Sequence, residues 1–184
     1  MWQILRQIAR TGIVSEPVPA RDDALRLPSA HDSEAERIGA EILATLGQAL
    51  TIRAVDAGSC NGCELEIHAL GNPYYNLEGL GIKFVASPRH ADLLLVTGPV
   101  SRHMAEALRR TWEAMPAPKL VVALGECGAS GGVFGACSHA ICGGVAEVVP
   151  VDVVVPGCPP APIEILRGIL SAVRRDVAGK GRDG

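Results

Sequence analysis

The sequence predicts a doubly wound α/β domain, in which helices cover both faces of a parallel sheet, preceded by an N-terminal helical extension. Short apolar runs bounded by glycine and proline alternate with segments of helical periodicity, which is the element order of such a domain. The 184 residues are 48% hydrophobic but only 3% aromatic, so Val, Leu, Ile and Ala must form the core. The sequence leaves the order of the strands open.

Composition and charge argue against several kinds of protein. A net charge of −3 without a long basic block argues against a surface that binds nucleic acid. No apolar run approaches the roughly 18 residues of a membrane span, and the N-terminus lacks the pattern of a signal peptide. We therefore expect a cytoplasmic protein with reduced thiols, in which six cysteines favour metal binding or catalysis over disulfides.

The extension, residues 1–49, has three parts. Residues 1–13 place four apolar side chains on one helical face, namely Trp2, Leu5, Ile8 and Ala9. This segment is either an interfacial helix on a membrane or a membrane subunit, or a helix packed on its own domain or a soluble partner. Residues 14–31 are rich in proline and predict an extended linker. Ser33 and Glu36 form a capping-box pattern, which predicts a helix that runs to about Gln48.

The α/β domain, residues 50–177, contains five predicted strands. They are residues 51–56, 82–85, 91–96, 119–124 and 151–155. A helix follows the first strand, and a second spans residues 101–115. The last helix is expected to begin at Pro159 and Pro160, since proline is tolerated in a first helical turn. Residues 178–184 are predicted to be a flexible tail.

Four cysteines follow three of these strands. Cys60 and Cys63 come after the first strand, Cys127 after the fourth and Cys158 after the fifth. If the strands run parallel, all four lie beyond carboxyl ends at one edge of the sheet, which is where open α/β sheets bind ligands. Four thiolates at one point predict a metal site.

Three kinds of site compete for these thiols. A structural zinc usually takes its ligands from two local pairs of Cys or His, whereas this chain has one Cys-x-x-Cys and two isolated cysteines. A thioredoxin-type redox pair would use Cys60 and Cys63 but leave Cys127 and Cys158 without a role. An iron–sulfur cluster explains all four, because it is large enough to be held from three separate loops. The cluster is the favoured interpretation, and a zinc-stabilised binding domain without redox activity is the alternative from another class.

A glycine-rich segment, residues 128–135, follows Cys127 and permits close backbone approach to a bulky group. A phosphate cradle is the competing interpretation, but no Gly-Lys-Ser/Thr follows. Cys137 and Cys142 lie beyond this segment with only His139 as a further ligand, which is too few for a second cluster. We interpret these two cysteines as packed free thiols.

The cysteine motifs resemble those of the small, cluster-bearing subunit shared by respiratory complex I and the energy-converting membrane-bound [NiFe]-hydrogenases. The resemblance rests on four ordered motifs: CNGCELE at Cys60–Glu66, SPRHAD at Ser87–Asp92, GECGASGG at Gly125–Gly132 and PGCPPAPIE at Pro156–Glu164. Complex I members typically carry adjacent cysteines in the first motif. The spacing of Cys60 and Cys63 instead looks like the hydrogenase branch, formate hydrogenlyase in particular.

The resemblance implies a flavodoxin-like domain that binds one [4Fe–4S] cluster through Cys60, Cys63, Cys127 and Cys158. It implies a subunit, not catalytic by itself, that relays electrons between a [NiFe] large subunit and ferredoxin-like subunits of a membrane-associated hydrogenase complex. Integral membrane subunits complete such a complex, which places the chain peripherally on the cytoplasmic side of the membrane. The alternative is a complex I-like 20 kDa subunit that passes electrons to quinone. A single cluster is expected, since the chain lacks the further cysteine-rich domain of uptake hydrogenases.

Two acidic residues accompany the first motif. One interpretation makes Glu64 and Glu66 proton-relay groups or carboxylates beside the cluster, facing a partner's active site. The other makes them acids that the helix dipole favours at a helix start. We favour the functional interpretation for Glu66 more than for Glu64.

Overall fold

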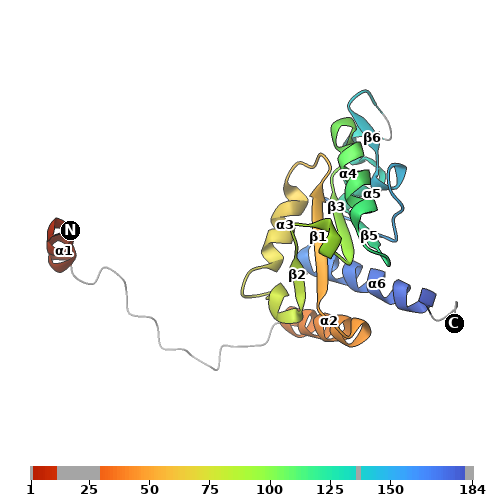
Figure 1. Ribbon diagram of the computed structural model, residues 1–184. Coiled ribbons are helices and arrows are strands. Elements are labelled where there is room, and N and C mark those ends of the chain that lie inside the picture. The colour runs from red at the N-terminus through yellow and green to blue at the C-terminus, as the bar shows by residue number, and fades with distance from the viewer. Residues whose placement is uncertain (1, 12–29, 136–137, 181–184) are drawn as a thin grey trace.

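The computed structural model describes residues 2–11, 30–135 and 138–180 of the chain (Figure 1). A sheet of five parallel strands forms its centre. The strands are β1 (Leu50–Asp56), β2 (Ile82–Phe84), β3 (Leu93–Thr97), β5 (Leu120–Leu124) and β7 (Val153–Val155), in the spatial order β2-β1-β3-β5-β7. This is the strand order of flavodoxin-like folds, in which the order reverses between the first and third parallel strands. The predicted fold class is confirmed, and the structure adds the strand order.

Helices cover both faces of the sheet. One face carries α2 (Ala30–Leu46), α3 (Gly62–Leu70) and α6 (Pro162–Lys180), and the other carries α4 (Arg102–Ala114) and α5 (Gly125–Ser130).

The central strand β3 shows how the two cores arise. Leu93 and Leu95 pack into the core beneath α2 and α6, whereas Leu94 and Val96 pack into the core that contains Leu108 of α4. Every residue of β3 is buried, as expected for a parallel strand with both faces covered. Aliphatic side chains therefore fill the cores on both faces of β3, which agrees with the low aromatic content of the sequence.

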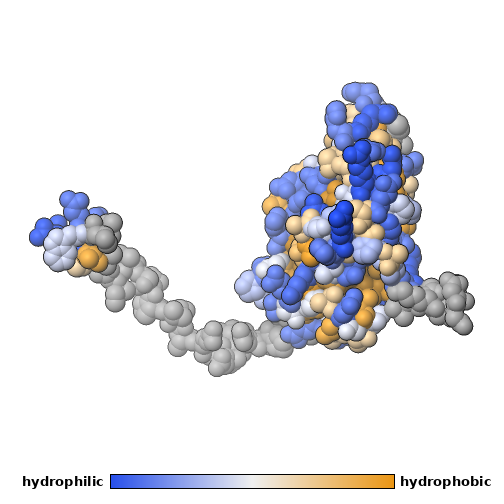
Figure 2. All heavy atoms as spheres, in the orientation of Figure 1, coloured by the Kyte–Doolittle hydropathy of each residue, from blue (hydrophilic) through white to orange (hydrophobic). Residues whose placement is uncertain are grey.

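The outer surface of α4 is hydrophilic, as Figure 2 shows. Leu108 on the inner side is buried, and Met104 and Trp112 pack beside it against the same core. Ser101 precedes the helix, and its side chain accepts a hydrogen bond from the Met104 N–H at 3.3 Å. A serine cap of this kind fixes the helix start.

Several short elements were not predicted. Strands β4 (Val100–Ser101) and β6 (Ile141–Gly143) pair antiparallel in a small second sheet. Four short 3-10 helices occur among the described residues: η2 (Leu77–Leu80), η3 (Pro88–His90), η4 (Gly132–Phe134) and η5 (Val145–Glu147). Elements of two to four residues are too short to leave a periodic pattern in the sequence.

Two predicted helix starts were wrong. Helix α2 begins at Ala30, three residues before Ser33, so the capping-box interpretation does not hold. Helix α6 begins at Pro162, and Pro159 and Pro160 lie in the preceding loop. A proline still occupies the first helical position. At its other end α6 extends to Lys180, so the first residues of the predicted tail are helical.

The N-terminal segment forms a helix, α1 (Trp2–Thr11), on which Trp2 and Leu5 are exposed. The predicted linker lies almost entirely outside the described residues. Helix α2 packs against α6 and contributes Ala35, Ile38 and Ile42 to the core. Within the part of the chain that the structure describes, no helix combines the length and apolar character that crossing a membrane requires.

Candidate metal centre

The loop after β1 carries the first cysteine pair. Asp56 ends the strand, and its side chain accepts hydrogen bonds from the N–H groups of Gly58 at 2.8 Å and Ser59 at 2.7 Å. This turn leads to Cys60, which is exposed, and to Cys63 in the first turn of α3, which is half-buried. Both thiols therefore lie at the N-terminal end of α3, beyond the carboxyl end of β1.

The turns that carry the other two cysteines are tied to each other. Cys127 lies in α5, directly after β5, and Cys158 follows β7. The Glu126 N–H donates a hydrogen bond to the Gly157 carbonyl at 2.9 Å, and Glu126 Oε1 accepts one from the Gly157 N–H at 3.2 Å. This reciprocal pair holds the two turns side by side.

All three turns meet at Gly125. Its φ of +77° lies in the left-handed region, which favours glycine. A Cβ at this position would lie 2.9 Å from Cys63 Sγ and 3.2 Å from the Gly157 carbonyl oxygen. The absence of a side chain therefore lets the Cys63 thiol lie against the backbone that leads to Cys127.

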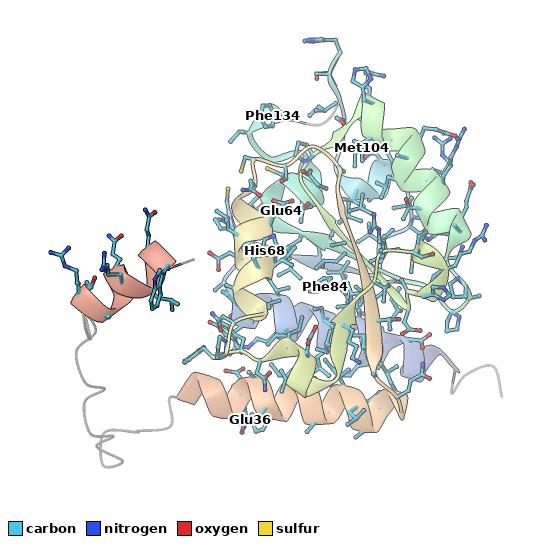
Figure 3. All side chains as sticks on the ribbon, turned by 60° about the vertical axis from the view of Figure 1, so that its left-hand side comes forward. Glu36, Glu64, His68, Phe84, Met104 and Phe134 are labelled. Carbon is cyan, nitrogen blue, oxygen red and sulfur yellow. The ribbon has the colours of Figure 1, made fainter. Side chains whose placement is uncertain are left out.

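The glycine-rich segment lies against the third thiol. A Cβ on Gly132, whose φ is +55°, would lie 2.7 Å from Cys127 Sγ. The backbone of this glycine-rich segment thus approaches the sulfur of Cys127 closely. The next residues, Val133 and Phe134, are 91% and 62% exposed, and Leu65 on α3 is 61% exposed. Figure 3 shows Phe134 and Glu64 at the same end of the molecule. The cysteines thus lie on a surface with several exposed apolar side chains.

The thiols influence one another electrostatically. Burial raises the pKa of Cys63 from 9.0 to about 11, with smaller contributions from the charges of Glu64, Cys127, Cys60 and Cys158. Burial also raises the pKa of Cys127, followed by the charges of Cys158, Cys60 and Glu126. Such a group of thiols is held as thiolates only when a positive centre compensates their mutual repulsion.

The spacing of the thiols bears on the kind of centre they fit. Among the residues described, no three His, Cys, Asp or Glu side chains lie close enough together to hold one metal ion. A tetrahedral zinc with Zn–S bonds of about 2.3 Å would bring its sulfurs to roughly 4 Å from one another. In a four-iron cluster each cysteine binds a different iron, so the sulfurs stand further apart. Four thiols on three separate turns are the kind of donor set that iron–sulfur clusters use.

Glu64 and Glu66 differ in their surroundings. Glu64 Oε2 accepts a hydrogen bond from Ser59 Oγ at 2.6 Å, and Oε1 accepts one from Thr97 Oγ1. Glu66 is half-buried, and its side chain makes no hydrogen bond to any residue that the structure describes. Sequence reasoning missed Ser59 and Thr97, because Thr97 lies 33 residues from Glu64 and carries no local signal.

A cavity of about 600 Å³ lies beside the first motif, between α3, η2 and β2. Its lining includes Glu64, Ile67 and His68 of α3 and Phe84 of β2. Figure 3 shows that His68 lies one turn further along α3 than Glu64. The cavity gives this side of the cysteine motif a concave surface of mixed polar and apolar character.

The structure describes one of the two remaining cysteines. Cys142 is half-buried in β6 and packs against the core beneath α4, as predicted for a packed thiol. Cys137 lies outside the described residues, and His139 is exposed.

The raised pKa of Cys63 predicts a pH dependence for protein prepared without iron. The native thiol holds its proton more tightly than the unfolded one, so its contribution to stability is present below about pH 9 and is lost as the pH rises to about 11. Urea denaturation at pH 8 and pH 10.5 measures this loss, and Cys63→Ser serves as the control that lacks it. Equal pH dependence in the two proteins would contradict the prediction.

The fold and the four cysteines together define the class of protein. It is a flavodoxin-like domain with cysteine-bearing turns at the carboxyl edge of its sheet. Comparison with known proteins identifies the family within this class. The chain belongs to the family described as NADH ubiquinone oxidoreductase, 20 Kd subunit, whose match covers residues 60–172.

Relatives in this family carry two kinds of name. The chain is 41% identical over 155 residues to formate hydrogenlyase subunit 7 of Escherichia coli (strain K12), which covers 84% of this chain and 60% of that relative. It is 42% identical to the probable membrane-bound hydrogenase subunit mbhJ of Pyrococcus furiosus, over 79% of this chain and 88% of the relative. It is also 47% identical to a subunit of the NADH-quinone oxidoreductase of Desulfovibrio desulfuricans, over 59% of this chain and 58% of the relative.

Solved structures show the same fold. A chain of the membrane-bound sulfane sulfur reductase, an archaeal respiratory membrane complex, matches with a TM-score of 0.57 and 30% identity, over 75% of each chain. A chain of an NAD⁺-reducing [NiFe]-hydrogenase matches with a TM-score of 0.53 and 20% identity, over 67% of this chain and 92% of that one. The second likeness concerns the fold alone.

Proposed function

We propose that this chain is an electron-transfer subunit of a membrane-associated hydrogenase-like complex and binds one [4Fe–4S] cluster through Cys60, Cys63, Cys127 and Cys158. The observation that carries the proposal is the meeting of three cysteine-bearing turns at Gly125. The chemistry that such a cluster supplies when bound is one-electron transfer. The chain itself contributes the thiolates, their spacing and the charges around them.

The partners in this proposal follow from the relatives. Relatives named as formate hydrogenlyase and membrane-bound hydrogenase subunits support a complex with a [NiFe] large subunit, ferredoxin-like subunits and integral membrane subunits. The exposed apolar side chains of Leu65, Val133 and Phe134 suit contact with another subunit, which would also keep water from the exposed Cys60 and Cys158. In this proposal the chain is a peripheral subunit on the cytoplasmic side of the membrane.

A quinone-reducing complex is the second candidate function, because relatives named as NADH-quinone oxidoreductase subunits match at similar identity. The two residues between Cys60 and Cys63 favour the hydrogenase branch. The sequence of the large subunit encoded with this chain decides between them. Two Cys-x-x-Cys pairs in that large subunit would support a nickel site and hence a hydrogenase, and their absence would remove that interpretation.

Replacement of any one of the four ligand cysteines with Ala is expected to abolish the low-temperature EPR signal of the reduced protein. Wild-type protein purified without oxygen should contain about four iron and four labile sulfide per chain. Cys142→Ala is the matched control, since that thiol packs against the core and should leave the signal intact. A normal signal from Cys158→Ala would overturn the ligand assignment, and zinc in place of iron would overturn the function.

A further inference from the structure

The carboxylate of Glu64 connects two segments that are far apart in the sequence. Ser59 Oγ donates to Glu64 Oε2 at 2.6 Å, and Thr97 Oγ1 donates to Glu64 Oε1. Thr97 is the last residue of β3 and is only 2% exposed, the one fully buried polar residue in the described ranges. Glu64 thus joins the loop of the first cysteine pair to the neighbouring central strand.

The same contact reaches the backbone between the two cysteines. Ser59 Oγ accepts a hydrogen bond from the Asn61 N–H at 3.0 Å while it donates to Glu64. Asn61 has a φ of +72°, in the left-handed region, which few residues other than Gly, Asn and Asp adopt. A backbone in this state persists only where its surroundings hold it. A continuous chain of contacts therefore runs from Thr97 through Glu64 and Ser59 to Asn61.

We propose that Glu64 is a positioning residue, which sets the separation of Cys60 and Cys63 by holding their loop against the end of β3. The inference rests on the proposed cluster. It assigns to Glu64 a role that differs from proton relay, in which the carboxylate acts through the two hydrogen bonds that its oxygens accept from within the chain.

The negative charge of Glu64 and its hydrogen bonds should have opposite effects on the cluster, so a variant can tell the two effects apart. Glu64 is the residue next to Cys63, and a negative charge there would repel the thiolates that a cluster requires. A benefit of Glu64 for the cluster must then come from its hydrogen bonds. Glutamine can keep them, since its Oε1 accepts from one hydroxyl and its Nε2 donates to the other. Thr97 Oγ1 can then donate to the Val55 carbonyl, which is 3.4 Å away.

The test compares variants of the full chain, purified in its complex without oxygen, by the rate at which a chelator removes iron. Glu64→Ala is expected to lose iron about tenfold faster than wild type and to show a broadened EPR signal, because two hydrogen bonds to a charged group are lost. Glu64→Gln should lose iron within about twofold of the wild-type rate and keep the EPR line shape.

Two further variants keep the test decisive if Glu64→Ala does not fold. Thr97→Val removes one hydroxyl without changing α3, and should accelerate iron loss. Glu66→Ala removes an equal charge from the same helix, and should leave iron retention at the wild-type rate, whatever its effect on turnover. Wild-type retention in Glu64→Ala and Thr97→Val would overturn the inference, as would a glutamine variant as defective as the alanine one. Wild-type protein without iron would instead overturn the proposed function itself.

Discussion

Gly125→Ala is expected to abolish iron retention in a protein that still folds. The new methyl group would lie 2.9 Å from Cys63 Sγ, closer than real Cβ contacts allow, and 3.2 Å from the Gly157 carbonyl oxygen. The Gly157 carbonyl is held by the Glu126 N–H, so the Cys63 sulfur has to move. Overpacking costs about 1–3 kcal/mol, and a φ of +77° adds about 1–2 kcal/mol for alanine.

Iron content and the EPR signal of the reduced protein measure the effect on the site, and urea denaturation measures the effect on stability. Gly47→Ala is the matched control, because Gly47 has a φ of +66° and no atom within 4 Å of the position of a Cβ. It should lose about 1–2 kcal/mol of stability and keep its iron. Full iron in Gly125→Ala, or equal iron loss in the control, would contradict the role of Gly125 as the meeting point of the three turns.

The strands and the ligand turns were predictable because their signals are local. The central strands β3 and β5 are apolar runs buried on both faces, and each cysteine-bearing turn follows a short strand within a few residues. The five predicted strands accordingly match β1, β2, β3, β5 and β7 to within a few residues. Because the strands run parallel, the residues that follow their carboxyl ends all lie at one edge of the sheet. The candidate cysteines therefore followed from element order alone, without knowledge of strand order.

The helix starts were less predictable because more than one residue can begin a helix. Nothing between residues 29 and 33 stops a helix, since this stretch contains neither proline nor glycine, and α2 extends back to Ala30. At α6 the decisive residue is Pro162, because a proline disfavours helical geometry in the residue before it. Pro159 and Pro160 therefore cannot lie in the same continuous helix, although each alone would be tolerated in a first turn.

The contacts that shape the site were not predictable, because they depend on strand order. β1 and β3 are neighbours although residues 57–92 separate them, and this adjacency brings Thr97 to Glu64. It also brings Gly98, directly after β3, against the loop after β1. In a flavodoxin-like order this is the point where the strand order reverses and ligands bind. The close packing between the two segments is thus a consequence of topology.

Gly98→Ala is expected to lower the free energy of unfolding by roughly 2–5 kcal/mol. Its φ is +76°, and a Cβ would lie 2.4 Å from Ser59 N, 2.6 Å from Ser59 Cα and 2.8 Å from the Gly58 carbonyl carbon. All three are backbone atoms, which cannot rotate away. The Ser59 N–H is also held by Asp56 at 2.7 Å, so relief of the clash requires the whole loop to leave β3.

Such a displacement would separate Ser59 and Glu64 from Thr97, so iron should be lost together with stability. Urea denaturation and iron content of the same preparations test both parts. Gly47→Ala again supplies the comparison, since Gly47 has a φ of +66° but no atom within 4 Å of the position of a Cβ. A Gly98→Ala protein as stable as Gly47→Ala and fully loaded with iron would show that the loop after β1 does not depend on its contact with the end of β3.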